Sequence, residues 1–254
     1  MEKTFALDEA LAASLTYFNG DSLAADVFVK KYALRNSGGD LLELTPSDMH
    51  RRLAREFARI EQKYPGDHRS LSEAEIYRLF DRFEFVVPQG SPMSGIGNNN
   101  HIQSLSNCFT IAAPEDSYGG IMRADQEQAQ IMKRRGGVGF DISTIRPKGV
   151  PTSNAAVTTA GIGVFMERFS NTAREVAQGG RRGALLLSIM CNHPQIETFV
   201  NIKRDKKKVT GANVSIKVTD EFMNAVKEDK PFTLKWPVDS VNPSVIREID
   251  ARSL

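Results

Sequence analysis

Apolar residues recur at helical spacing through the first part of the chain. Two such segments, residues 7–18 and 22–32, are separated by a polar turn. Two stronger helix starts follow. Thr45 precedes a proline and lies three residues before an acid, and Ser72 lies three residues before a glutamate, the spacing of a capping box. Residues 1–87 are therefore predicted to form a helical domain.

Each of the two later helices carries an apolar stripe that we expect to be buried. Steps of three and four residues place each set on one face of its helix. The first stripe comprises Met49, Leu53, Phe57 and Ile60. The second comprises Ile76, Leu79, Phe80 and Phe83.

The pattern changes at Pro88. Residues 88–107 are rich in Gly, Ser, Asn and Pro and predict a loop. From Cys108 onward short apolar runs alternate with helical stretches, which indicates an α/β fold with parallel strands. The predicted strands are 108–113, 138–142, 183–190, 211–218 and 232–236. The predicted helices are 117–134, 158–177, 193–203 and 220–228.

Composition narrows the class of protein. Hydrophobic residues make up 41% of the 254 residues and charged residues 25%, which excludes disorder of the whole chain. No apolar run approaches the roughly 18 residues of a membrane span, and the first residues do not resemble a secretory signal. Two cysteines cannot form a disulfide framework, so a reducing, cytoplasmic setting is expected. The net charge, 33 − 31 = +2, disfavours non-specific nucleic-acid binding.

Cys108 is the first candidate for chemistry. It follows segment 104–107, the end of a polar loop, and begins a predicted strand. Functional side chains are commonly found where a loop meets a strand. The alternative is a small buried hydrophobic residue, the commoner role of a single cysteine. The local sequence by itself favours the alternative.

Two glycine–arginine turns, residues 133–141 and 178–184, each lead into a predicted strand. Glycines let the backbone approach a phosphate, and arginines supply paired donors. Segment 133–141 is neither a Walker loop nor a dinucleotide fingerprint. A plain helix-to-strand connection explains either one alone, whereas the two together favour a nucleotide site. The basic run 203–208 is expected to be a solvated turn rather than a phosphate site.

Other catalytic classes find little support. No Gly-x-Ser-x-Gly motif of a serine hydrolase occurs. The four histidines are scattered, without zinc-ligand spacing, so no metal site is predicted. They are His50, His68, His101 and His193.

Taken in order, these segments resemble the catalytic large subunit of ribonucleotide reductase, of the class I or adenosylcobalamin-dependent class II type. Residues 48–52 resemble that family's N-terminal helical domain. The other matching segments are 87–93, 104–108, 116–117, 135–146, 178–184 and 193–194. The resemblance implies an α/β fold: a helical domain, residues 1–87, followed by residues 88–254 as the first part of a ten-stranded α/β barrel, incomplete in this chain.

The resemblance also implies roles for individual residues. Cys108 matches one of the two redox thiols that reduce the ribose, a task that suits a dithiol because it delivers two reducing equivalents. Positions near the substrate are matched by Ser91, Ser106, Asn107, Gly137 and Arg182. Positions that bind a dNTP or ATP effector are matched by Asp116, Ser117, Lys133, Arg135, Arg146, Gln178 and Arg181. Segments 134–146 and 178–184 match the two specificity loops, with Gln178 and Arg182 reporting effector identity to the active site.

Departures from the family pattern limit what the chain can do. The Asn-x-Cys-x-Glu motif of the radical cysteine does not occur, and Cys191 does not match the partner of Cys108. The family's N-terminal regulatory cone and its later barrel strands have no counterpart. The chain is therefore expected to be an N-terminal part of the reductase that needs a C-terminal part for catalysis. A non-catalytic nucleotide-binding or assembly module, and an inert remnant, stay as alternatives.

The resemblance finally implies cofactors and partners. No cofactor is expected on this segment, and the radical source is either a metal-containing small subunit or adenosylcobalamin. Expected partners are a ribonucleotide substrate, a dNTP or ATP effector, the C-terminal portion, a second copy of the chain, and a thioredoxin or glutaredoxin system. Whether the substrate is a diphosphate or a triphosphate is left open.

Overall fold

The protein is described by a computed structural model that covers residues 3–64, 66, 69–176 and 183–254. The chain divides into two compact units, the first running to Asn107 and the second beginning at Cys108. Segment 88–107 is thus part of the first unit. The predicted domain boundary at residue 88 stays a prediction.

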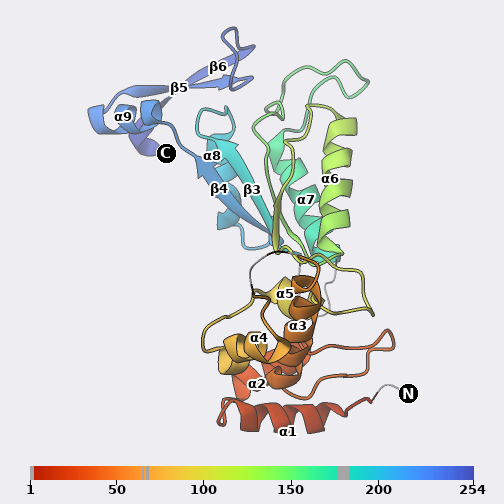
Figure 1. Ribbon diagram of the computed structural model, residues 1–254. Helices are drawn as coiled ribbons and strands as arrows, with labels where there is room; N and C mark the ends of the chain where they lie inside the picture. Colours follow the sequence, from red (N-terminus) through yellow and green to blue (C-terminus); the bar gives the residue numbers. More distant parts are fainter. Residues whose placement is uncertain (1–2, 65, 67–68, 177–182) are drawn as a thin grey trace. The chain divides into compact units, whose positions relative to one another are not determined.

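The first unit is helical, as the sequence predicts (Figure 1). Its helices are α1 (Leu7–Tyr17), α2 (Ser22–Lys31), α3 (Pro46–Glu61), α4 (Glu73–Phe80), the 3-10 turn η1 (Asp81–Phe83) and α5 (Gly90–Gly95). Both predicted capping boxes are present. The Asp48 carboxylate accepts from the Thr45 backbone N–H at 3.0 Å, and the Glu75 carboxylate accepts from the Ser72 N–H at 2.9 Å. Each box satisfies amide groups that a helix start leaves without partners.

Part of each predicted apolar stripe was wrong. Met49 and Leu53 are fully buried on α3, but Phe57 is 42% exposed. The buried face continues instead through two alanines, Ala54 and Ala58, which belong to the core of the helical unit. Leu79 is likewise 39% exposed on α4.

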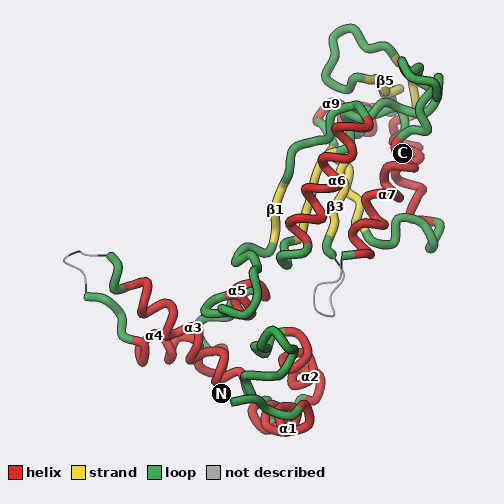
Figure 2. The backbone as a smooth tube through the Cα atoms, turned by 90° about the vertical axis from the view of Figure 1, so that its right-hand side faces the viewer, coloured by secondary structure: helices red, strands yellow, loops and turns green. Residues whose placement is uncertain are grey.

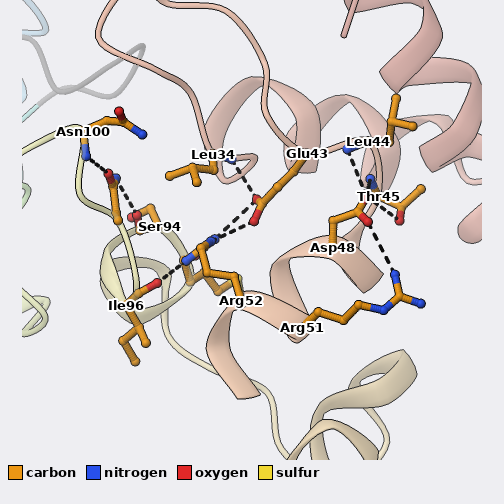
Figure 3. Close-up of polar contacts among 12 residues, drawn as sticks. Leu34, Glu43, Leu44, Thr45, Asp48, Arg51, Arg52, Ser94, Ile96 and Asn100 are labelled. Atoms are coloured by element: carbon orange, nitrogen blue, oxygen red, sulfur yellow. Dashed lines mark hydrogen bonds and ion pairs between the residues drawn. The ribbon is translucent and has the colours of Figure 1, made fainter. Parts of the chain in front are cut away.

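The prediction of a loop for residues 88–107 was wrong at α5. This short helix is rich in Gly and Ser, which have low helix propensity. A tertiary partner compensates: the Arg52 guanidinium on α3 donates to the Met93 carbonyl within α5 at 2.8 Å. It also donates to the carbonyl of Ile96, the residue after the helix (Figure 3). Sequence periodicity carries no signal for such a contact.

The second unit contains a parallel sheet in the order β1-β2-β3-β4. The strands are β1 (Cys108–Thr110), β2 (Gly137–Asp141), β3 (Leu185–Met190) and β4 (Ala212–Lys217). The connecting helices are α6 (Tyr118–Met132), α7 (Ile162–Glu175), α8 (Ile196–Asn201) and the turn η2 (Ile202–Arg204). Helices α6 and α7 lie side by side in both views (Figures 1 and 2).

Alternate residues of the sheet are buried against the helices. On β3, Leu185, Leu187 and Ile189 are buried, whereas Leu186 between them is 42% exposed. The ring of Phe140 on β2 packs edge to face against the ring of Phe169 on α7, with 4.9 Å between the ring centres. The four strands form an open row, so the described chain contains a partial barrel. The predicted fold class, a helical domain followed by the first part of an α/β barrel, is confirmed.

The second unit ends with α9 (Asp220–Glu228), an antiparallel pair of strands and the turn η3 (Ala251–Ser253). Strand β5 (Pro231–Trp236) was predicted and β6 (Val245–Asp250) was not. Two charged residues, Arg247 and Glu248, lie at the centre of β6 and interrupt its apolar pattern. No helix in the described ranges is long and apolar enough to span a membrane.

Candidate nucleotide site

Two predicted effector residues meet beyond the carboxyl ends of neighbouring strands. Asp116 follows β1 and Arg146 follows β2, and parallel strands end at the same edge of a sheet. The Asp116 carboxylate accepts from the Arg146 backbone N–H at 2.9 Å and from its Nε at 2.6 Å. The side chains keep 21% and 28% of their surface exposed. The pair is therefore held by two bonds and can still be reached from solvent.

This ion pair lines a cavity of about 240 Å³. A loop adds lining residues with hydroxyl and amide side chains, and aromatic and aliphatic side chains complete the lining. The lining residues are Asp116, Ser117, Tyr118, Ile121, Arg146, Thr152, Ser153, Asn154, Thr159 and Phe165. Polar hydrogen-bonding groups beside an apolar surface are the usual composition of a small-molecule site.

The N-terminus of α6 opens into the same cavity. Ser117 is its N-cap, and the hydroxyl accepts from the Gly120 N–H at 3.0 Å. A side chain at position 120 would collide with Glu115, whose carbonyl oxygen lies 2.6 Å from where a Cβ would stand. Glycine thus lets the chain turn tightly into the helix. The start of a helix carries partial positive charge and favours anions.

Arg146 has two further contacts. Its Nη1 donates to the Pro151 carbonyl at 2.7 Å, and its guanidinium lies 5.8 Å from the centre of the Trp236 ring on β5. The Trp236 indole N–H donates to the Thr144 carbonyl at 3.2 Å. Sequence analysis missed Trp236, because only tertiary structure brings β5 to this edge.

The cavity wall also corrects a predicted helix boundary. Helix α7 begins at Ile162, four residues later than the predicted start at 158. Gly161 adopts a φ of +81°, which a helix cannot contain, and Thr158 pairs with Pro151 in an antiparallel bridge. Thr159, which lines the cavity, therefore lies in the loop before α7 and not on the helix.

Cys108 lies at the opposite, amino edge of the sheet. Its side chain is exposed, so the interpretation as a buried hydrophobic residue was wrong. Its register partner on β2 is Gly137, another predicted site residue. Paired residues present their side chains on one face of a sheet, so a glycine leaves room beside the thiol.

The family resemblance places Lys133 and Arg135 among the effector residues. They lie in the short connection between the end of α6 and the start of β2, and thus at the amino edge with Cys108. A five-residue strand such as β2 separates the two edges by about 17 Å. The structure does not bring these two cations to the cavity of Asp116 and Arg146.

Three predicted substrate residues lie in the first unit. Ser91 is buried, and its backbone N–H donates to the Asn107 side-chain oxygen at 2.7 Å. The Asn107 amide donates in turn to the Gln89 side-chain oxygen. Ser106 is exposed, and its N–H donates to the Ser104 hydroxyl at 2.9 Å. Ser91 and Asn107 are thus joined directly.

Some predicted residues cannot be placed. Gln178, Arg181 and Arg182 lie outside the described residues, as does His68. Within the described ranges no group of three or more His, Cys, Asp and Glu side chains could hold a metal ion.

An all-α unit followed by a parallel α/β unit defines an α/β protein, and its cavity lies beyond the carboxyl ends of the strands, where such proteins commonly bind ligands. Residues 106–251 match the family model described as ribonucleotide reductase, barrel domain, and residues 18–97 match ribonucleotide reductase, all-alpha domain. The chain belongs to the ribonucleotide reductase large-subunit family.

Similar proteins carry corresponding names. The chain is 37% identical over 139 residues to ribonucleoside-diphosphate reductase large chain 2 of Saccharomyces cerevisiae, covering 52% of this chain and 16% of the yeast protein. It is 31% identical over 212 residues to a vitamin B12-dependent ribonucleoside-diphosphate reductase of Mycobacterium tuberculosis, covering 82% of this chain and 30% of that protein. The chain thus spans less than a third of the length of these relatives.

Proposed function

We propose that this chain is part of a ribonucleoside reductase large subunit, and that its cavity at Asp116 and Arg146 binds a dNTP or ATP effector. The observation that carries the proposal is the convergence of an arginine, a helix N-terminus, a hydroxyl-rich loop and apolar side chains on one cavity. Family membership supplies the reaction, the conversion of ribonucleotides to deoxyribonucleotides.

Each part of the cavity suits one part of a nucleotide. The α6 N-terminus and Arg146 favour the phosphates by charge. The Asp116 carboxylate is an acceptor that a sugar hydroxyl can donate to. Phe165 and Tyr118 offer aromatic surface to the base. The second specificity loop, residues 178–184, would carry the identity of the effector to the active site.

The exposed Cys108 thiol is the proposed redox group. It and a second thiol each give up one hydrogen and join as a disulfide. One hydrogen leaves with the ribose 2′-hydroxyl as water, and the other takes the place of that hydroxyl on C2′, so the ribose gains the two electrons that the thiols lose. Cys191 is fully buried and does not suit the role of second thiol. The second thiol, the radical cysteine and the radical source would come from other segments, and a thioredoxin or glutaredoxin system would reduce the disulfide. A cytoplasmic location follows from this chemistry as a prediction.

Calorimetry with dTTP, dATP, dGTP and ATP tests the effector site. We expect binding to the wild-type chain, and a loss of at least tenfold in affinity for Asp116→Ala and for Arg146→Ala, about 1.4 kcal/mol or more. Asp8→Asn, on an exposed position of α1, is the control and should bind as wild type does. Equal affinity in all four proteins, or no binding to any, would contradict the proposal.

A further inference from the structure

The turn that follows β3 contains a histidine whose tautomer is fixed by its partners. His193 is fully buried. Its Nδ1 accepts from the Gln195 backbone N–H at 3.0 Å, and its Nε2 lies 3.0 Å from the Ile145 carbonyl oxygen. A backbone N–H can only donate, so Nδ1 is unprotonated and Nε2 donates to Ile145. Burial lowers the pKa of His193 to about 4, so the neutral form persists at neutral pH.

The neighbouring Gln195 makes a second pair of contacts. Its side-chain oxygen accepts from the Lys148 N–H at 2.9 Å and from the Ile162 N–H at 3.0 Å. The second of these N–H groups begins α7 and has no partner inside the helix. Gly161 lies so close that a Cβ there would collide with the same oxygen. The backbone is thus built to fit around this carboxamide.

Together the two side chains fix both ends of one loop. At the near end, His193 donates to the Ile145 carbonyl and Gln195 accepts from the Lys148 N–H. At the far end, Gln195 accepts from the Ile162 N–H. Between these anchors lie five residues that line the cavity: Arg146, Thr152, Ser153, Asn154 and Thr159. Neither His193 nor Gln195 is among the described residues that line it.

We infer that His193 and Gln195 are positioning residues for the nucleotide cavity, which they shape by clamping the loop from Ile145 to Ile162. The inference rests on the proposed function for the identity of the ligand, and on the contacts above for the clamp. Arg146 follows Ile145 directly, so a shift of that carbonyl moves the arginine relative to Asp116. Without the clamp, nucleotide binding would itself have to order the loop, and this cost in free energy would lower the affinity.

Two substitutions of Gln195 with side chains of similar size distinguish the effect of its hydrogen bonds from the effect of its volume. Gln195→Glu keeps an oxygen that accepts from both N–H groups, whereas Gln195→Met keeps the length and removes the acceptor. Gln126→Met, at an exposed position of α6, is the matched control. Each protein is measured twice: by hydrogen exchange at the Lys148 and Ile162 amides without ligand, and by calorimetry with dTTP, dATP and dGTP.

We expect Gln195→Met to speed exchange at both amides and to weaken nucleotide binding at least tenfold, with Gln195→Glu and Gln126→Met close to wild type. Wild-type affinity in Gln195→Met, or equal damage in Gln195→Glu, would overturn the inference. If Gln195→Met does not fold, Gln195→Asn takes its place, since its shorter amide cannot reach both N–H groups. If the wild-type chain binds no nucleotide, the proposed function fails, while the exchange data still decide whether the clamp exists.

Discussion

The buried ion pair between Glu43 and Arg52 makes a quantitative prediction for the helical unit. Their side chains are 5% and 11% exposed. The Glu43 carboxylate accepts from Arg52 Nε at 2.7 Å, from Arg52 Nη2 at 3.3 Å and from the Leu34 N–H at 2.8 Å (Figure 3). Glu43→Met removes all three acceptor contacts and leaves a buried guanidinium without its counter-charge. Breaking such a pair costs about 3–5 kcal/mol.

Urea unfolding followed by two signals measures this effect. Far-ultraviolet circular dichroism reports the helices of both units, and the single tryptophan, Trp236, reports the second unit alone by fluorescence, so a change seen by dichroism but not by fluorescence belongs to the first unit. We expect Glu43→Met to lower the midpoint of the helical transition by about 1 M or more, given a slope of about 1–3 kcal/mol per molar urea. The fluorescence transition should keep its midpoint.

Two further variants define the control and the refutation. Glu56→Met breaks a surface pair with Arg59 and should leave the urea midpoint close to that of the wild type, because solvent screens such pairs. The double variant of Glu43→Met with Arg52→Met should cost less than the sum of its two single variants, because no buried charge is left alone. A loss below about 1 kcal/mol for Glu43→Met would show that solvent screens the pair, and would refute the reasoning.

Three other predictions follow from burial and close contact. Burial lowers the pKa of His50 and of His193 to about 4, so the unfolded chain binds more protons than the folded chain between pH 6.5 and 4. The free energy of unfolding should therefore fall as the pH falls through this window, by up to about 3 kcal/mol for each histidine. Urea midpoints at pH 7 and pH 4.5 measure the change. A stability independent of pH would contradict this. Cys108 should react with iodoacetamide in the native chain and Cys191 only on unfolding, which peptide mass spectrometry distinguishes. Gly120→Ala should lower the melting temperature despite the better helix propensity of alanine, because its Cβ meets Glu115; an unchanged or higher melting temperature would argue against that contact.

Local signals made the helical unit predictable. The capping residues Thr45 and Ser72 act within one helix turn, so the sequence reveals them. Helix α5 was missed because its carbonyls depend on Arg52, about 40 residues earlier in the chain. The start of α7 was misplaced because Gly161 packs against a side chain from another loop.

The site was predictable only in part. Motif resemblance pointed to Asp116 and Arg146, and their contact spans 30 residues of sequence. Phe165 and Trp236 reach the same edge through the packing of α7 and β5, which no local pattern encodes. The exposure of Cys108 depends on the sheet and on Gly137 in the next strand. Long-range packing thus accounts for what the sequence did not reveal.

The central claim is that this chain contributes the Cys108 thiol and an effector cavity to ribonucleotide reduction. The most direct measurement mixes the chain with a polypeptide that carries the rest of the barrel and its Asn-x-Cys-x-Glu loop. A dithiol reductant, a dNTP effector and each radical source in turn are added, and deoxyribonucleotide formation is followed. The account predicts product with the wild-type chain and with Cys191→Ala, and none with Cys108→Ser or with the chain alone. Product from Cys108→Ser or from the chain alone, or no product from any mixture, would contradict it.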